Sequence, residues 1–412
     1  MSAPSSDRSD RSDRSDRSDR VGSLPLLPEL ARTDEERALT DAVGAYLDNE
    51  LPPERVLDLD ERRDLPVEVW RGLSTLGLLG IGVPEELGGS GGGAAEAFIV
   101  TSEIARRFPS LAVDYVLVAM TARTYVEHGT PEQQKVLADF ASGELISCFG
   151  ISEPDGGTDA LALRTRAREV DGEWRITGRK LWISMAHHAD QMLLLARTDE
   201  PTDPARRAHG VSLIQVPMDQ PGITVRKVPL AGMRSAGTCE VVLDDAVAPL
   251  GNIIGERGRG FHGLRTSLAV ERVLSAAISI GIGRQALDLA LEYARERQAF
   301  GRSIGEFQAV QHRLVDAVAE VGAAQLLVER AVRAIDDGVE STAAATLAKA
   351  HAAEVTARAV DVGMRTMAAM GLAAESRMQL LFRDARLQLF SPVSNEMARN
   401  LSGEALGLGR SY

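Results

Sequence analysis

The chain has 412 residues, enough for two or three domains or one large one. It carries 46 Lys and Arg against 59 Asp and Glu, a formal net charge of −13, which argues against nucleic acid as the main partner and against a polybasic membrane anchor. With 44% hydrophobic and 25% charged residues, no long apolar run and no signal-peptide pattern, we expect a soluble protein without a membrane span. Two cysteines, Cys148 and Cys239, exclude a disulfide framework and favour a cytoplasmic location. Histidine and cysteine spacing predicts no metal site.

Residues 6–20 are five copies of Ser-Asp-Arg. The repeats hold no apolar residue and have nearly balanced charge, so burial cannot offset the entropy of ordering them. We therefore expect residues 1–27 to form a disordered tail.

Residues 28–146 have a helical pattern. Thr33 followed by Glu36, and Thr130 followed by Pro131 and Gln133, have the spacing of capping boxes at helix starts. We expect an N-terminal helical domain.

Residues 147–250 change to short β-rich runs separated by Gly, Pro and Asp turns, which predicts a small antiparallel β domain of barrel or sandwich type. The expected strands are 192–196, 211–216, 223–228 and 240–243.

Helical periodicity returns in residues 251–412. Apolar side chains recur on one face from Val310 to Val328 and again from Ala286 to Ala294, as in long helices packed in a bundle. The order predicts an α+β multidomain protein with an N-terminal helical domain, a central antiparallel β-barrel-like domain and a C-terminal four-helix bundle.

Three segments carry candidate chemistry, and each has an ordinary structural alternative. Residues 149–159 (FGISEPDGGTD) offer glycines and hydroxyls to a polar ring edge or a phosphate, or form a plain turn. Residues 180–184 (KLWIS) offer an indole and a hydroxyl to a planar heterocycle; alternatively, Trp182 is a buried core residue. Arg297 could pair with a diphosphate or end a helix whose last turn favours positive charge.

In this order and spacing, the three segments resemble those of the acyl-CoA dehydrogenase family, over nearly all of residues 28–412. Five further segments support the resemblance: 76–81 (LGLLGI), 83–91 (VPEELGGSG), 243–249 (LDDAVAP), 258–261 (GRGF) and 382–386 (FRDAR). The resemblance implies FAD at a domain junction and assembly as a homodimer or homotetramer.

The resemblance also assigns site residues. The segments that hold the isoalloxazine correspond to Phe149, Ile151, Ser152, Thr158, Trp182, Ile183 and Ser184. The segment that contacts FAD across a subunit interface corresponds to Arg297, Gln298, Ala299, Phe300, Phe307 and Gln308. The remaining nucleotide contacts correspond to Arg365, Ala368, Ala369, Ser394 and Glu396, and the substrate contacts to Thr158 and Arg272.

One departure from the family lies in its Gln-x-x-Gly-Gly-x-Gly nucleotide segment, which is RTMAAMG at 365–371 here. Ala368 and Ala369 replace glycines and leave less room for close backbone approach. Arg365 could add charge toward the diphosphate.

The second departure removes the usual base. Many members have a glutamate in the loop after Arg-Asp-Ala, but the ungapped position here is Pro392, which has neither a carboxylate nor an N–H. Some members, the isovaleryl-CoA dehydrogenases among them, carry the base on a helix just before an arginine. Glu271, before Arg272, corresponds to that position and lies on an otherwise largely apolar stripe. It is the candidate catalytic base, and the alternative is a structural glutamate paired with arginine.

The function implied is FAD-dependent α,β-dehydrogenation of an acyl thioester carried by CoA or by an acyl carrier protein, with an electron-transfer flavoprotein as electron acceptor. Two alternatives stay open: a flavin-dependent monooxygenase on the same scaffold, and a redox-inactive binding or assembly subunit.

Overall fold

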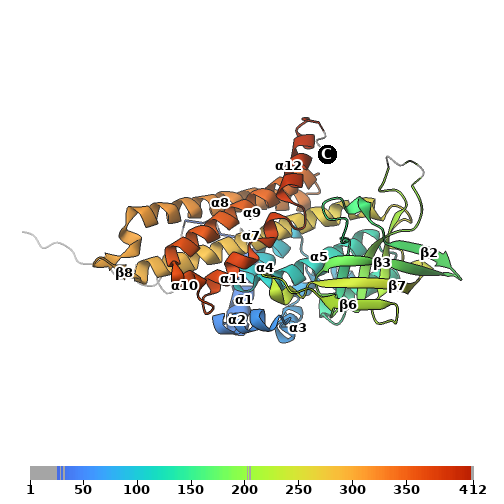
Figure 1. Cartoon of the computed structure of the whole chain (residues 1–412), viewed down its shortest axis with the longest axis horizontal. Helices are drawn as coiled ribbons and strands as arrows, with labels where there is room; N and C mark the ends of the chain where they lie inside the picture. Colours follow the sequence, from blue (N-terminus) through green and yellow to red (C-terminus); the bar gives the residue numbers. More distant parts are fainter. Residues whose placement is uncertain (1–25, 28, 31–32, 202, 204–205, 410–412) are drawn as a thin grey trace, which may run out of the picture.

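The computed structural model describes residues 26–27, 29–30, 33–201, 203 and 206–409; at residues 265 and 266 it describes the backbone alone. The predicted disordered tail lies almost wholly outside the described residues. Figure 1 shows an elongated molecule with long helices at one end and a twisted sheet at the other.

The N-terminal helices begin where the sequence places helix-start signals. Thr33 and Glu36 make both reciprocal bonds of a capping box at the first helix, as predicted. Thr130 and Gln133 exchange the same pair of bonds ahead of the sixth. The helices are α1 (Asp34–Glu50), α2 (Pro53–Arg62), α3 (Val67–Thr75), α4 (Ala94–Arg107), α5 (Pro109–His128) and α6 (Val136–Ser142).

The middle of the chain forms a seven-stranded sheet in the order β1-β4-β2-β3-β7-β6, with β5 on the other side of β4. The pairs β1–β4 and β2–β4 are parallel and the others antiparallel. All four predicted strands are present. The strands are β1 (Ser147–Gly150), β2 (Arg166–Val170), β3 (Glu173–Ile183), β4 (Gln191–Arg197), β5 (Val211–Pro217), β6 (Ile223–Lys227) and β7 (Cys239–Pro249).

The C-terminal helical domain is built on three long helices. The predicted apolar stripe on α8 is confirmed, since Leu314, Ala317, Val321, Ala324 and Val328 are buried. The elements are α7 (Gly260–Glu296), a hairpin of β8 (Gln298–Ala299) and β9 (Arg302–Ser303), α8 (Gln308–Asp336), α9 (Thr342–Met367), α10 (Ala369–Leu372), α11 (Arg377–Asp384) and α12 (Asn395–Ala405). Figure 1 shows α12 standing off the long helices.

The central helix α7 is long and apolar enough to cross a membrane by length and composition alone. However, 82% of its apolar 18-residue window is buried inside the protein. Side chains from both helical segments, such as Phe98 of α4 and Ile280 of α7, belong to one hydrophobic core. Burial of this kind identifies α7 as the core helix of a helical body.

The two helical segments are also joined at a helix end. The Asp336 carboxylate, at the end of α8, accepts hydrogen bonds from the Ala94 and Ala95 N–H groups, at 2.6 and 3.0 Å. These donors open α4 and have no partner within that helix. A carboxylate there also suits the positive end of the helix dipole. The sheet has a separate core around Trp174 and Ile176.

Candidate active site

The loop between β1 and β2 is held by a buried ion pair. Lys180 of β3 is fully buried, and its Nζ lies 2.8 Å from Oε1 of Glu153. The same ammonium donates to the Ile151 and Leu195 carbonyls at 3.1 and 2.8 Å. The Glu153 carboxylate accepts from the Arg164 and Thr165 N–H groups at 2.6 and 3.0 Å. Both ends of the loop are therefore fixed to β3.

Burial lowers the pKa of Lys180 to about 8, although Glu153 opposes the shift. The pKa of Glu153 is lowered, because Lys180 and the hydrogen bonds from Thr165 and Arg164 outweigh its burial. Both pKa shifts are consistent with an ionised pair in which burial disfavours the charge of Lys180 more than that of Glu153.

The same contacts bring the first two predicted segments together. The Leu181 N–H donates to the Ser152 carbonyl at 3.0 Å, so residues 149–152 run beside residues 180–183. Phe149 and Ile183 are buried, Ile151, Ser152 and Ser184 are partly buried, and Thr158 is exposed. Gly157 faces open space, since a Cβ there would meet no atom within 4 Å.

Trp182 is exposed and lies in left-handed backbone. It lies at a register shift in the β3–β7 pairing, has a φ of 66°, and leaves 54% of its surface exposed. A bulky residue in left-handed backbone is strained, and such strain gathers at ligand sites. The predicted alternative of a core tryptophan is wrong for this residue. The exposed indole, the adjacent hydroxyl of Ser184 and the open glycine loop fit a planar ring such as an isoalloxazine.

The third predicted segment lies elsewhere in the chain. The β8–β9 hairpin and the start of α8 are at the end of the helical body away from the sheet (Figure 1). Arg297, Gln298 and Gln308 are exposed, and Phe300 is 96% exposed. The Phe307 ring packs against Phe300, with centroids 6.1 Å apart, and Ala299 is partly buried. One chain therefore does not bring these residues to Trp182.

The altered nucleotide segment lies at the C-terminal end of α9. Ala368 has a φ of 52° at a position where the resemblance expects glycine, and it is exposed together with Ala369. Arg365 forms an ion pair with Asp361 one turn earlier, at 2.8 Å. Its charge is therefore already partnered within α9.

Glu271 lies partly buried on α7. Burial raises the pKa of Glu271 to about 7, against the lowering effects of Arg272 and Lys349. Arg272 donates from Nη1 to Thr346 Oγ of α9 at 3.0 Å. Burial also lowers the pKa of Arg272, which Glu271 opposes. A carboxyl with a pKa near neutrality can both accept and release a proton near neutral pH.

The loop that contains Pro392 packs against α9. Lys349 Nζ donates to the Val393 carbonyl at 2.6 Å and to Asn395 Oδ1 at 3.2 Å. Pro392 itself is exposed, as is Glu396 in the first turn of α12. Ser394 caps α12 by accepting from the Met397 N–H. Sequence reasoning missed Lys349, which lies beside no motif. It also missed Glu153, which lies inside the 149–159 segment, because its contact with Lys180 spans 27 positions.

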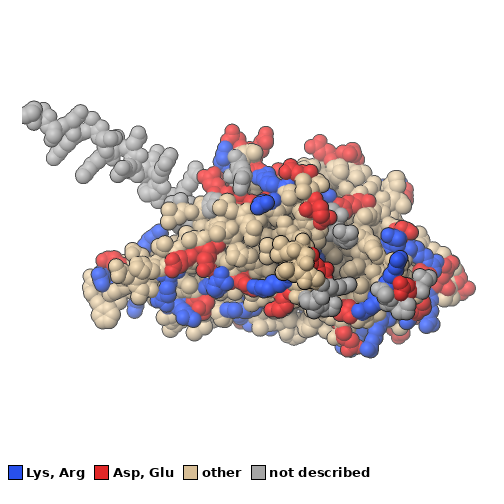
Figure 2. All heavy atoms as spheres, turned by 90° about the horizontal axis from the view of Figure 1, so that it is seen from above, with Lys and Arg blue, Asp and Glu red and all other residues tan. Residues whose placement is uncertain are grey.

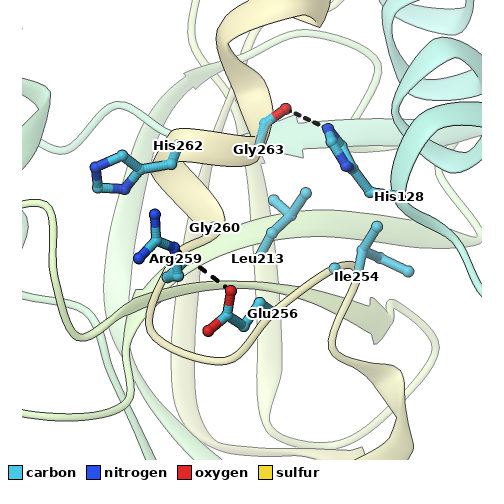
Figure 3. Close-up of a pocket in the computed structure, with 9 residues that line it drawn as sticks. His128, Leu213, Ile254, Glu256, Arg259, Gly260, His262 and Gly263 are labelled. Carbon is cyan, nitrogen blue, oxygen red and sulfur yellow. Dashed lines mark hydrogen bonds and ion pairs between the residues drawn. The ribbon is translucent and has the colours of Figure 1, made fainter.

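A separate pocket of about 250 Å³ opens where α5, β5 and the start of α7 meet (Figure 3). Its polar groups already have partners: His128 bonds the Gly263 carbonyl at 2.5 Å, and Arg259 pairs with Glu256 at 3.4 Å. None of the predicted site residues lines it. Among the described residues, no group of three His, Cys, Asp or Glu could hold a metal ion.

Comparison with known proteins identifies the family. The acyl-CoA dehydrogenase N-terminal, middle and C-terminal domain families match residues 33–144, 148–246 and 258–407. The acyl-CoA dehydrogenase FadE12 of Mycobacterium tuberculosis is 33% identical over 384 residues, covering 92% of this chain and 98% of that protein. Isovaleryl-CoA dehydrogenase of Pongo abelii is 29% identical, covering 90% and 89%.

Comparison with solved structures finds the same fold. The butyryl-CoA dehydrogenase of Megasphaera elsdenii superimposes with a TM-score of 0.87 at 27% identity, covering 92% of this chain and all of that one. A prolyl acyl carrier protein oxidase, AnaB, has a TM-score of 0.86 at 21% identity, which concerns the fold alone.

The helical body and the half-barrel sheet, together with these relatives, identify an oxidoreductase of the class that acts on CH–CH groups. The chain belongs to the acyl-CoA dehydrogenase family, whose members are flavoproteins that generally bind FAD. The predicted fold and enzyme class are confirmed.

Proposed function

We propose that this chain is an FAD-dependent acyl-thioester dehydrogenase whose base is Glu271 and not a glutamate in the Pro392 loop. The observation that carries the proposal is the position of Glu271: it lies partly buried on α7, next to an Arg272 that donates a hydrogen bond to Thr346 of α9. The burial of Glu271 also raises its pKa to about 7. Pro392 can neither accept a proton nor donate an N–H. The resemblance to isovaleryl-CoA dehydrogenases supports this choice, because these members carry the base at the helix position that corresponds to Glu271. One of them is 29% identical to this chain.

The residues around the loop and β3 would hold the cofactor. Trp182 and Ser184 would flank the ring, and the loop of residues 152–158 would offer backbone N–H groups to its polar edge. Bound FAD supplies the acceptor for the hydride that leaves the β-carbon. Glu271 would take the proton from the α-carbon, and Arg272, oriented by Thr346, would contact the substrate beside it.

Arg297 and Gln308 would serve a second subunit. They lie on the hairpin end of the helical body, away from Trp182, and Phe300 beside them is almost fully exposed. We therefore propose an oligomer in which each site is completed by its neighbour, with one FAD per subunit. The domain division 28–146, 147–250 and 251–412 and a cytoplasmic location belong to the same proposal.

The decisive experiment is anaerobic stopped-flow reduction of the flavin by a panel of acyl thioesters. Wild-type protein should bleach with at least one acyl group. Glu271→Gln should retain FAD and bind substrate but slow bleaching at least about 100-fold, the low end of general-base contributions. If the Gln variant bleaches at the wild-type rate, Glu271 is structural, and Glu396 is the next carboxylate to substitute.

The same panel separates the remaining alternatives. Each acyl group is presented on CoA and on a carrier protein, and the faster arm identifies the carrier. Rapid oxygen consumption by the reduced protein would indicate a monooxygenase. Absence of bound FAD would indicate a redox-inactive subunit. Re-oxidation by an electron-transfer flavoprotein tests the proposed electron acceptor.

A further inference from the structure

A buried polar pair lies one helical turn beyond Glu271. Ser275 of α7 donates from Oγ to Gln388 Oε1 at 2.7 Å. Gln388 belongs to a short 3₁₀ helix, Leu387–Leu389, that precedes the loop with Pro392. Only 5% of the surface of Ser275 and 2% of that of Gln388 is exposed. Residues four apart on a helix share a face, so this pair borders the same side of α7 as Glu271.

The hydrogen bond from Ser275 leaves half of the Gln388 amide unused. It occupies the amide oxygen and so directs the two N–H groups of Nε2 away from Ser275. Nε2 itself makes no hydrogen bond to any residue that the structure describes. Buried amide donors in folded proteins normally have a partner, because an unpaired donor destabilises the fold. The free N–H groups of Gln388 therefore point to a ligand.

The surface of α7 beside this amide is accessible. Leu268 and Glu271, which lie on the same side of α7 as Ser275, are only partly buried. The Glu271 carboxylate makes no hydrogen bond within the described part of the chain. One turn further, Ser275 is buried and bonded to Gln388. The accessible strip of α7 thus runs past the proposed base and ends at the Gln388 amide.

We propose that Gln388 is a specificity-determining residue whose amide N–H groups, held in place by Ser275, bind an oxygen atom on the acyl group. The inference rests on the proposed role of Glu271. The substrate class is then an acyl thioester with a carbonyl, hydroxyl or ether oxygen along its chain. An N–H group is matched only by an acceptor, so a plain alkyl chain leaves the buried donor unpaired.

Helix geometry gives the position of that oxygen on the acyl chain. Four residues of α-helix rise about 6 Å, which is the offset of Ser275 from Glu271 along α7. An extended carbon chain advances about 1.3 Å per bond, since each bond is about 1.5 Å long. With the α-carbon, carbon 2, beside Glu271, an oxygen on carbon 5 or 6 comes within reach of the amide. These carbons lie beyond the bond between carbons 2 and 3 that is dehydrogenated.

The first test compares matched thioesters in anaerobic flavin reduction by the FAD-loaded protein. The 5-oxohexanoyl and 6-oxoheptanoyl thioesters are set against the hexanoyl and heptanoyl thioesters on the same carrier. Wild-type protein should favour at least one oxo thioester over its alkyl counterpart by about tenfold in kcat/KM. Gln388→Leu removes the donor at similar side-chain size and should bring this ratio to about one. Ser275→Ala frees the amide to turn and should lower the ratio several-fold.

Binding provides a second readout that does not depend on turnover. In Glu271→Gln protein, which should bind thioesters without rapid reduction of the flavin, calorimetry should show the same preference in Kd. Adding Gln388→Leu to this protein should abolish the preference. Asn49→Leu, which removes an exposed amide on α1, is the matched control and should keep the wild-type ratio. A merely structural Gln388 would lower the melting temperature on substitution and leave the ratio unchanged.

Equal rates for the oxo and alkyl thioesters in wild-type protein, or an undiminished oxo preference in folded Gln388→Leu, would overturn the inference. Should Gln388→Leu fail to fold, Gln388→Glu decides, because it keeps the side-chain length and replaces the donor with a carboxylate; it should also lose the oxo preference. Failure of the proposed function gives a different result. Glu271→Gln would then bleach at the wild-type rate, whichever acyl group is used.

Discussion

The raised pKa of Glu271 predicts that this residue lowers the stability of the protein at neutral and alkaline pH. In the folded protein the pKa is about 7, against an ordinary value of 4.5. The folded state then binds a proton in the window between these two values, where the unfolded state does not. The favourable contribution of the protonated carboxyl is complete below about 4.5 and is lost as the pH rises through 7.

The magnitude follows from about 1.4 kcal/mol per pKa unit. Relative to wild type, the neutral Glu271→Gln variant should gain about 1 kcal/mol in the free energy of unfolding at pH 5 and about 3 kcal/mol at pH 8. The variant should therefore melt above the wild type at both pH values. For a protein of this size, its excess in melting temperature over the wild type should be roughly 3 °C larger at pH 8 than at pH 5.

The assay is calorimetry of both proteins, loaded with FAD, at the two pH values. Glu375→Gln, which changes an exposed carboxyl between α10 and α11, serves as the matched control and should show little change in melting temperature. If Glu271→Gln differs from the wild type in melting temperature by the same amount at pH 5 and pH 8, the pKa of Glu271 is not raised. If Glu271→Gln melts below the wild type at pH 8, the ionised carboxylate is stabilising.

Three further results are expected. Lys180→Met should destabilise the protein by about 3–5 kcal/mol, because it leaves the Glu153 carboxylate buried without its cation, and should weaken FAD retention measured by flavin absorbance after gel filtration. Arg297→Ala should release FAD more readily while leaving the melting temperature of the FAD-free protein unchanged; full FAD occupancy in a stable monomer would contradict the shared site. Removal of residues 1–23 should change neither the melting temperature nor the turnover, because the repeats have nothing to bury; loss of either would show that the tail docks.

Local signals in the sequence predict local structure well here. The capping box at Thr33 and the β-rich run 192–196 both correspond to elements of the fold, since each depends on neighbouring residues. The parallel pairing of β1 with β4 could not be predicted in this way, because it joins residues more than forty positions apart.

The same limit applies to the site. The motif around Trp182 indicates a ring-binding residue, but its exposure follows from a register shift against β7. The Lys180–Glu153 pair joins two motifs across 27 positions, and periodicity does not predict such a contact. Lys349 lies in an alanine-rich helix, and only its packing against the Pro392 loop distinguishes it from a surface lysine.

Both signs of charge are spread over the face seen in Figure 2, around a largely uncharged central area that covers the helical body.

The helical body is assembled from the two ends of the chain, because Asp336 caps α4 and the two helical segments share one core. During synthesis, the first N–H groups of α4 can bond only to water until Asp336 of α8, about 240 residues later, has been made. The sheet is complete at Pro249, and it has one core of its own and a second that it shares with α5 and α6, which precede it in the chain. The sheet, α5 and α6 can therefore pack together before the C-terminal helices are synthesised.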